Sequence, residues 1–394
     1  MIYKDFQDKK LSLLGFGAMR LPTLADGQID EPQVAQMVKF ALENGVNYFD
    51  TAWPYHGGMS EIVIGKALKA YPRDSYYLAT KYPGHQVSSS YDPAAIFEAQ
   101  LKKCGVEYFD FYLLHNVYEN SMPVYLDPQW NILGYFKEQK RLGRIKHLGF
   151  SSHGRVDNLR EFLDAAGDDM EFCQIQLNWL DWTLQEAEKK VALLNERNIP
   201  VWVMEPVRGG RLCKLDAKAE ETLKSLRPDA GIPEWSFRFL QGIPGVTMVL
   251  SGMSDMQQLQ ENVQTFAESK PLNEKESGAL MTIAEGMKNA VPCTGCRYCT
   301  EHCPMGLDIP LMMETCSDLR FAPTTNSAMR LEWLADDKQP SACIGCGACA
   351  AMCPQKIEIP GVMRELAEML KTIPKWLDIC KEREEAAKKL AAKG

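Results

Sequence analysis

Eight cysteines near the C-terminus have the spacing of metal-cluster ligands. They form two groups with the same pattern, C-x2-C-x2-C-x3-C-P. Two residues separate each of the first three cysteines from the next, three residues separate the third from the fourth, and a proline follows the fourth. The members are Cys293, Cys296, Cys299 and Cys303 in the first group and Cys343, Cys346, Cys349 and Cys353 in the second. Paired C-x2-C units can also bind zinc, but four-ligand zinc leaves the third cysteine, the fourth and the proline unexplained, twice over. The pattern therefore predicts two [4Fe–4S] clusters.

The fourth cysteine of each group is expected to serve the other cluster. Each group matches the bacterial ferredoxin run, in which this crossover is usual. Three thiolates fold around one face of a cube, and the fourth, displaced by the turn at the proline, reaches across. We expect cluster A to be held by Cys293, Cys296, Cys299 and Cys353, and cluster B by Cys343, Cys346, Cys349 and Cys303. Helical stretches at 309–319 and 327–335 separate the groups, which resembles the α-helical ferredoxin domains of multi-subunit reductases.

A second set of reactive side chains lies where strand-like runs end. Asp50 lies in the second run and Tyr55 follows it, Lys81 ends the third and His115 ends the fourth. A tyrosine is a poor acid at neutral pH, but a neighbouring ammonium lowers its pKa. Asp50 can hold Lys81 charged, and His115 can orient a carbonyl, so the set could protonate an alkoxide as hydride arrives. Taken singly, these residues could instead be a buried ion pair, a core histidine and a loop aromatic.

The elements that must position these residues alternate between two patterns. Short apolar runs are expected to be strands at 13–19, 47–52, 76–81, 109–115, 145–151, 172–177, 201–204 and 247–250. Amphipathic helices are expected at 31–43, 60–70, 93–104, 128–142, 156–166, 184–197, 233–241 and 255–265. Eight such units predict an α/β fold, a (β/α)8 TIM barrel, in which the strand ends meet at one face. The competing fold is a doubly wound open sheet, although no G-x-G-x-x-G follows the first strand.

The domain organisation follows from these patterns. We expect the barrel at 1–270, a connecting helix at 271–290, a mainly α-helical ferredoxin-like domain with two clusters at 291–360, and C-terminal helices at 361–394.

The composition and net charge of the chain limit the cellular compartment and the binding partners that can be expected. The chain has 394 residues, 45% hydrophobic residues and a net charge of -8, which argues against a nucleic-acid partner held by bulk charge. The N-terminus lacks an apolar signal segment, and no apolar run approaches the roughly 18 residues that span a bilayer. We therefore expect a cytoplasmic protein without membrane insertion. The scattered cysteines are expected to be free thiols: Cys104, Cys173, Cys213, Cys316 and Cys380.

Roughly the first 270 residues resemble the aldo-keto reductase superfamily. The resemblance rests on motifs in order: LGFGAMR, YFDTAWPYHGGMSEIVIGKAL, ATK, LLHN, LGFSSH, QIQLN, MEPVRGG and SGMSDMQQLQEN. It implies a nicotinamide cofactor, NAD(P)H, and reduction of a small carbonyl compound or oxidation of the alcohol. It further implies that Tyr55 is the general acid and that Lys81 lowers the pKa of Tyr55. It implies that Asp50 supports Lys81 and that His115 orients the substrate. The whole chain resembles the ferredoxin-fused branch of that superfamily.

The resemblance also implies where the cofactor binds. The matching positions are Ala18, Met19, Asp50, Ser151, Ser152, Gln174, Met204, Pro206, Ser251, Gly252, Gln258, Glu261 and Asn262. Ser152 stands where the family has asparagine, and Met204 where an aromatic ring stacks on the nicotinamide. Gly252 and Gln258 stand where NADPH-dependent relatives carry basic residues, which weakens the expectation of NADPH over NADH.

Three functions remain open at this point. Nicotinamide transfers two electrons as hydride, whereas a [4Fe–4S] cluster takes one. The chain could be an NAD(P)-dependent oxidoreductase that interconverts an aldehyde or ketone and an alcohol, with clusters for electron transfer or structure. It could be an electron-transfer protein whose barrel holds a flavin, for which no motif is seen, or another redox group, and whose clusters pass electrons to a redox protein partner. It could also be a sensor or scaffold whose barrel binds a nicotinamide cofactor. Aromatic candidates for the pocket lining are Trp53, Tyr82, His85, Tyr118 and Trp179.

Overall fold

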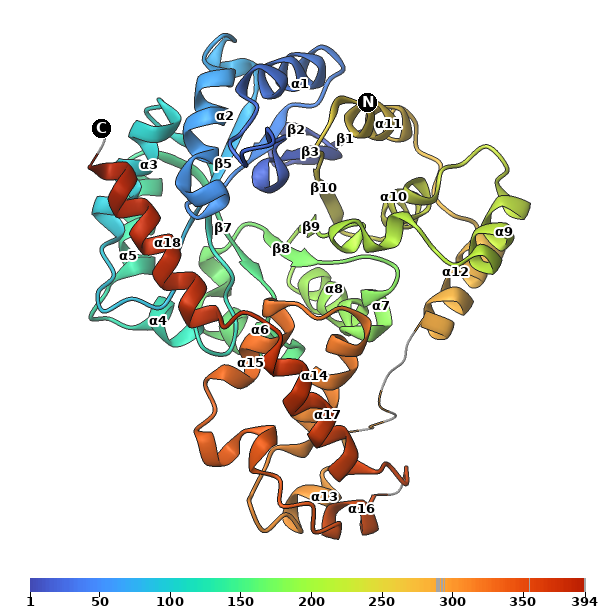
Figure 1. Ribbon diagram of the computed structural model, residues 1–394. Helices are drawn as coiled ribbons and strands as arrows, with labels where there is room; N and C mark the ends of the chain where they lie inside the picture. The colour runs from blue at the N-terminus through green and yellow to red at the C-terminus, as the bar shows by residue number, and fades with distance from the viewer. Residues whose placement is uncertain (288–290, 292, 294, 354, 393–394) are drawn as a thin grey trace. The chain divides into compact units, whose positions relative to one another are not determined.

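Eight parallel strands close into a barrel in the computed structural model (Figure 1). The structure describes residues 1–287, 291, 293, 295–353 and 355–392. The strand order is β10-β3-β4-β5-β6-β7-β8-β9, so every strand has two neighbours and the predicted TIM barrel is confirmed over the open sheet. The strands are β3 (Leu14–Gly17), β4 (Tyr48–Asp50), β5 (Tyr77–Tyr82), β6 (Phe109–Leu114), β7 (Ile145–Ser152), β8 (Cys173–Gln176), β9 (Val201–Met204) and β10 (Val246–Gly252).

Helices connect the barrel strands, as the periodicity predicts. Two of them begin at an aspartate followed closely by proline: Asp30 accepts a hydrogen bond from the Gln33 backbone N–H, and Asp92 from that of Ala95. The helices are α1 (Glu31–Glu43), α2 (Ser60–Leu68), α3 (Pro93–Cys104), α4 (Met122–Leu126), α5 (Ile132–Arg141), α6 (Val156–Ala166), α7 (Asp181–Leu184), α8 (Ala187–Glu196), α9 (Ala217–Leu226), α10 (Ile232–Gln241) and α11 (Met256–Thr265).

An antiparallel hairpin of β1 (Tyr3–Phe6) and β2 (Lys9–Ser12) precedes the barrel and was not expected from the sequence. Its buried Phe6 ring lies 5.5 Å from the ring of Phe111 and 5.1 Å from that of Trp202, centroid to centroid. These partners stand early in β6 and β9, so the hairpin closes the N-terminal end of the barrel. The opposite end, where the strands finish, is left for the candidate site.

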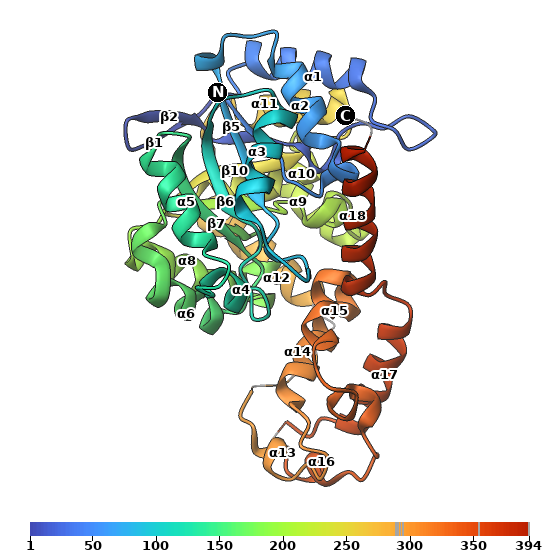
Figure 2. The same ribbon diagram turned by 90° about the vertical axis from the view of Figure 1, so that its left-hand side faces the viewer.

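The C-terminal region is helical. Backbone proximity divides the chain into one unit of residues 1–281 with 385–394 and another of residues 282–384. In the second unit α14 packs against both α15 and α17, around buried Met312, Met313 and Met363 (Figure 2). The helices of this region are α12 (Glu274–Met287), α13 (Tyr298–Glu301), α14 (Ile309–Phe321), α15 (Thr325–Glu332), α16 (Ala348–Ala351), α17 (Ile359–Lys371) and α18 (Trp376–Ala391).

The C-terminal region contains two copies of one structural unit. Each cysteine group is followed by a 13-residue helix that begins with Ile-Pro, α14 after the first group and α17 after the second. Residues 288–290 of the expected connecting helix, and Pro354 of the second group, lie outside the described residues. In the part of the chain that the structure covers, no helix is long and apolar enough to cross a membrane.

Candidate active site and cluster sites

A buried ion pair stands beside the hydroxyl of Tyr55. Asp50 ends β4, Lys81 lies near the end of β5, and Tyr55 opens the short 3-10 turn η2 (Tyr55–Gly58). The Lys81 Nζ atom lies 2.5 Å from Asp50 Oδ1 and 3.5 Å from the Tyr55 hydroxyl oxygen, and it donates to the Thr51 carbonyl at 2.9 Å. The structure therefore brings together three of the four residues that the sequence singled out for proton transfer.

The charge of this pair is held by mutual attraction. Burial by itself lowers the pKa of Lys81, but the charge of Asp50 and the interaction with the Tyr55 side chain outweigh it, and the pKa ends above the ordinary value. Burial raises the pKa of Asp50, against the lowering effect of Lys81. Lys81 is 0% exposed and Asp50 3% exposed, so both charges are shielded from solvent and the carboxylate of Asp50 is what keeps the ammonium protonated beside the Tyr55 hydroxyl.

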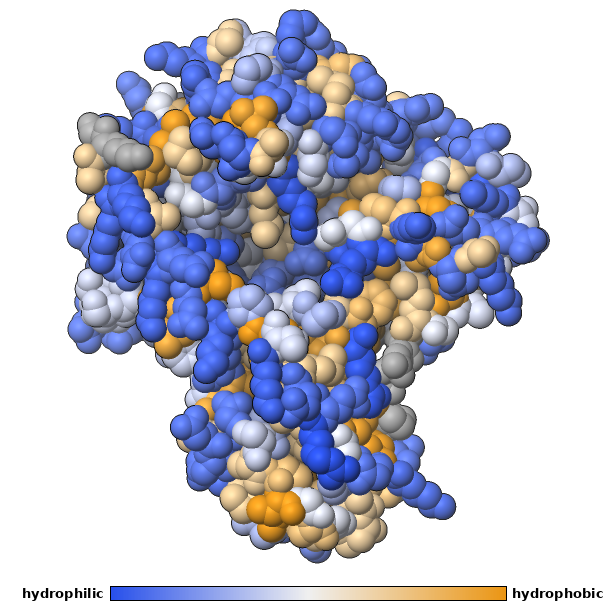
Figure 3. Space-filling view, viewed as in Figure 1, coloured by the Kyte–Doolittle hydropathy of each residue, from blue (hydrophilic) through white to orange (hydrophobic). Residues whose placement is uncertain are grey.

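His115, the fourth predicted residue, joins this group from the end of β6. Its ring lies edge-on to the Tyr55 ring, with centroids 6.0 Å apart and planes at 84°. A second imidazole, that of His85, lies against His115 with ring centroids 4.2 Å apart. The sequence indicated His85 only as part of an aromatic lining. In the space-filling view, the surface is hollowed at the centre of the ring of barrel elements (Figure 3).

The three residues expected at the nicotinamide carboxamide differ in whether their side chains already have hydrogen-bond partners. The Ser151 hydroxyl oxygen accepts a hydrogen bond from the Asn116 backbone N–H, and the Ser152 hydroxyl donates to the Val117 carbonyl. Gln174 at β8 is 3% exposed, and its Oε1 atom is buried without a hydrogen-bond partner among the described residues. An unpaired buried amide oxygen is costly, and the N–H2 group of a carboxamide would satisfy it.

Most of the predicted residues near the end of β10 have hydrogen-bond partners nearby in the chain. Asn262 donates to the Ser251 hydroxyl at 3.1 Å. The Gln258 side chain accepts from the Ser254 backbone and donates to Asp255, the residue that caps α11. These bonds stiffen the loop between β10 and α11. Of the other predicted positions, Ala18 and Pro206 are buried, Met204 is partly buried, and Met19 and Glu261 are exposed.

Arg20 is a residue that the sequence analysis missed. It follows β3, in the turn η1 (Ala18–Arg20), and its Cβ, Cγ and Cδ atoms lie 3.2–3.3 Å from the position a Cβ would take at Gly252. Its Nη2 atom lies 3.0 Å from the corresponding position at Gly209, in the loop after β9. The stem of Arg20 therefore occupies the space of a side chain at 252, and its guanidinium lies beside Gly209. The feature of the sequence that could have indicated Arg20 is a basic residue directly after the first predicted strand.

A buried polar network supports the ends of β8 and β9. Asp181 Oδ2 accepts hydrogen bonds from Gln176 at 2.8 Å and from Asn178 at 2.6 Å, and Arg208 Nε lies 3.5 Å away. Burial raises the pKa of Glu205 to about 7, helped by the Asp181 charge and opposed by the positive charges of Arg208 and Arg20. The network thus contains an acid that titrates near neutrality beside the cofactor positions.

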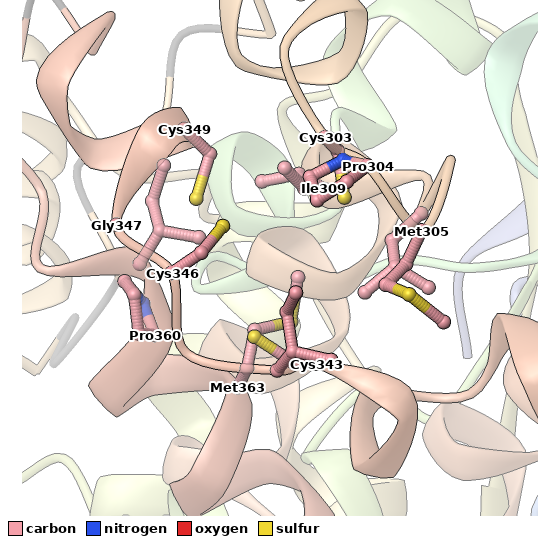
Figure 4. A pocket seen from close by; sticks show the side chains of 13 residues that line it. Cys303, Pro304, Met305, Ile309, Cys343, Cys346, Gly347, Cys349, Pro360 and Met363 are labelled. Atoms are coloured by element: carbon pink, nitrogen blue, oxygen red, sulfur yellow. The ribbon is translucent and has the colours of Figure 1, made fainter.

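The eight motif cysteines line two cavities in the C-terminal unit. One is lined by Cys303 of the first group and by Cys343, Cys346 and Cys349 of the second, whose sulfur atoms surround it (Figure 4). The other is lined by Cys353 of the second group and by Cys293, Cys296 and Cys299 of the first. Each cavity therefore meets three thiols of one group and the fourth thiol of the other, the sets that the crossover predicts.

The chemistry around the cavities suits a cluster. Ile309, Met313, Ile359 and Met363 complete the walls with apolar surface. No three metal-binding side chains in the described ranges converge as a single ion would require, and the thiols surround the cavities instead. Among the described residues the five scattered cysteines form no disulfide; Cys213 is partly buried and the other four are buried.

Comparison with known proteins identifies the class and then the family. The barrel with its strand-end site places the chain among TIM-barrel oxidoreductases. The chain belongs to the aldo/keto reductase family, whose profile matches residues 13–285, and it carries a 4Fe-4S dicluster domain, whose profile matches residues 292–358.

Relatives of the barrel are distant in sequence. An uncharacterized oxidoreductase, YqkF, of Bacillus subtilis is 26% identical over 70% of this chain and 93% of its own length. An NADH-specific methylglyoxal reductase of Escherichia coli is 23% identical over 71% of this chain and 97% of its own. The holo form of aldo-keto reductase AKR11C1 from Bacillus halodurans superposes with a TM-score of 0.58 at 27% identity, covering 72% of this chain and 96% of that one.

Proposed function

We propose that the protein is a nicotinamide-dependent oxidoreductase that interconverts a small aldehyde or ketone and its alcohol at the Tyr55 site. The observation that carries the proposal is the buried Lys81–Asp50 pair at 2.5 Å, with Lys81 Nζ at 3.5 Å from the Tyr55 hydroxyl. A buried ammonium beside a phenol favours proton release, because it stabilises the phenolate that remains.

Each residue of the site has one task in this reaction. The nicotinamide, when bound, supplies hydride to the carbonyl carbon. Tyr55 gives its hydroxyl proton to the oxygen that becomes negative, and Lys81 stabilises the resulting phenolate. Asp50 keeps Lys81 charged and oriented. His115 hydrogen-bonds the carbonyl oxygen and fixes its direction toward Tyr55.

Residues of this chain fit a nicotinamide cofactor. The unpaired Gln174 Oε1 atom can accept a hydrogen bond from the carboxamide. Arg20, whose stem packs on Gly252 and whose guanidinium lies beside Gly209, supplies a cation to the loops after β9 and β10 and can pair with a phosphate of the dinucleotide. A phosphate site between the loops after the last two strands is common in such barrels. The Escherichia coli relative, an NADH-specific methylglyoxal reductase, supports this assignment.

The clusters are proposed to have the crossed ligand sets of the two cavities. Cys293, Cys296, Cys299 and Cys353 would hold cluster A, and Cys343, Cys346, Cys349 and Cys303 cluster B. Bound there, the clusters supply one-electron chemistry, which a redox protein partner could use. The hydride step in the barrel needs no electron from them.

Isotope transfer tests the proposal. Anaerobically purified protein would be incubated with methylglyoxal and with NADH or NADPH deuterated at C4 of the nicotinamide. We expect deuterium at the carbinol carbon of the product and a visible spectrum with only a broad cluster shoulder. Flavin bands, with hydrogen from solvent at that carbon, would instead favour the electron-transfer protein with a flavin in its barrel.

A further inference from the structure

The walls of the two cysteine cavities correspond position by position. The two copies of the repeated unit are offset by 50 residues, as Cys293 and Cys343 show. The backbone follows this match, since Gly295 and Gly345 both have a φ of 69°. Apolar wall positions correspond in the same way: Ile309 with Ile359, Pro310 with Pro360, and Met313 with Met363. The repeat therefore builds two cavities of one design, and any difference between their walls separates two otherwise equal sites.

Two matched wall positions differ in polarity, both in the same direction. Arg297 and Gln355 line the cavity proposed for cluster A. Their counterparts in the cavity proposed for cluster B are Gly347 and Met305. Among its described lining residues, that second cavity has only apolar and thiol side chains. Arg297 has a φ of 64° and Gly347 a φ of 76°, so the arginine occupies a left-handed conformation that favours glycine.

The other charged groups near these loops lie outside both walls. Arg297 Nη2 is 3.4 Å from Asp308 Oδ2, and the arginine side chain is 56% exposed. Lys338 donates to the carbonyl of Met305 at 2.7 Å and lies 3.8 Å from Asp337. Neither Asp308 nor Lys338 lines a cavity, so Arg297 is the charged side chain among the described residues of the two walls.

We propose that Arg297, assisted by Gln355, makes cluster A the electron-accepting member of the pair. Reduction adds one negative charge to a cluster, and a cation or an N–H donor in the wall stabilises that charge, which raises the reduction potential. An electron shared by the pair then resides on cluster A: cluster B gives it up, cluster A gains it, and no bond forms or breaks. The inference rests on the crossed clusters proposed above and is independent of the carbonyl reduction.

An anaerobic redox titration followed by EPR spectroscopy tests the proposal, with dithionite as the reductant. Cys296→Ser and Cys346→Ser each change one exposed ligand of one set and thereby assign the two signals. We expect cluster A to be reduced first in the wild type. Because solvent screens part of the Arg297 charge, Arg297→Gly should lower the ratio of reduced to oxidised cluster A at a fixed potential about tenfold, or about 59 mV. The ratio for cluster B should stay within about twofold.

The repeat also supplies the reciprocal experiment. Gly347→Arg places the cation in the other wall, where an added Cβ would meet no atom within 4 Å. The ratio of reduced to oxidised cluster B should then rise about tenfold, and Arg297→Gly/Gly347→Arg should reverse the order of reduction. Lys338→Met removes an equal charge outside both walls and is the matched control; it should leave the ratio for cluster A within about twofold.

The possible results separate this inference from the cluster assignment. Coinciding midpoints in the wild type, or an unchanged midpoint of cluster A in Arg297→Gly, would overturn the inference alone. Arg297→Lys keeps the charge and should retain most of the potential; a loss as large as in Arg297→Gly would show that charge is not the cause and would also overturn it. Zinc in place of iron and sulfide would remove the proposed clusters and this inference together.

Discussion

The barrel site and the cluster region are built in opposite ways. In the barrel, Asp50, Lys81 and His115 come from three different strands, and only closure of the sheet brings them together. In the cluster region, three thiols of each cavity come from one short loop, and a single thiol crosses over. A site whose residues lie close together in the chain can be found from the sequence alone. A site whose residues come from separate strands can be located only when the fold is known.

The two regions also differ in the chemistry they support. The barrel site couples a proton to a pair of electrons, and the clusters exchange electrons singly. We therefore expect the two regions to be separable: changes in one should leave the other working. The predictions below test that separation, in order of decreasing effect.

The largest effect is expected from the buried pair. Lys81→Met should lower kcat by about 10³–10⁴-fold, because Tyr55 loses the cation that favours release of its proton. It should also cost about 3–5 kcal/mol of stability, since Asp50 is left buried without a counter-charge. Stopped-flow kinetics and anaerobic thermal unfolding measure the two effects. The double variant Lys81→Met/Asp50→Leu should regain stability but not turnover; recovery of turnover would contradict the assigned roles.

The next effect concerns the clusters. Wild-type protein should contain about eight iron and eight sulfide per chain, because each cube holds four of each. Cys353→Ser should perturb or empty cluster A, held mainly by the first group, and bring iron toward four, while turnover in the barrel stays within about twofold. Cys213→Ser, which changes a scattered thiol, is the matched control. If spectroscopy shows that only the cluster of the second group responds, the crossover is wrong; zinc without sulfide would reject clusters.

Arg20 should have a smaller effect, confined to cofactor binding. Arg20→Met should weaken NADPH by about tenfold and NADH less, because a charge-assisted bond to phosphate is lost. Arg20→Lys should fall between the two, since it keeps the charge but not the planar fork. Fluorescence titration gives the dissociation constants. Unchanged affinity for both cofactors in Arg20→Met would remove Arg20 from the site.

The smallest effect is a pH dependence of stability. The pKa of Glu205 in the folded protein is about 7, above its ordinary value of 4.5, so the folded state binds more protons between those values. Stability should therefore fall as pH rises from about 4.5 to 7 and stay level above. Glu205→Gln should be more stable than wild type at pH 8, by about 1–3 kcal/mol, and similar at pH 4.5. A variant less stable at pH 8 would show that the carboxylate is needed there.

The sequence predicted the parts of the molecule whose signals are local. The bounds of α1 and α3 were predicted as observed, because an aspartate cap and a nearby proline mark where each helix begins. The hairpin β1–β2 was missed, since its residues are mostly polar and Phe6 and Leu11 are its members in the buried cluster of the barrel. Arg20 over Gly252, and His85 against His115, depend on contacts between distant segments that no spacing encodes.

The central claim is that Tyr55 is the proton donor of a nicotinamide-dependent carbonyl reduction. The most direct measurement compares wild type and Tyr55→Phe, which removes the hydroxyl but keeps the ring, in both kcat and cofactor dissociation constant. A positioned acid contributes about 10²–10⁴-fold, so kcat should fall at least about a hundredfold. Cofactor affinity should stay nearly unchanged, because the cofactor residues are untouched. Unchanged turnover in Tyr55→Phe would contradict the account.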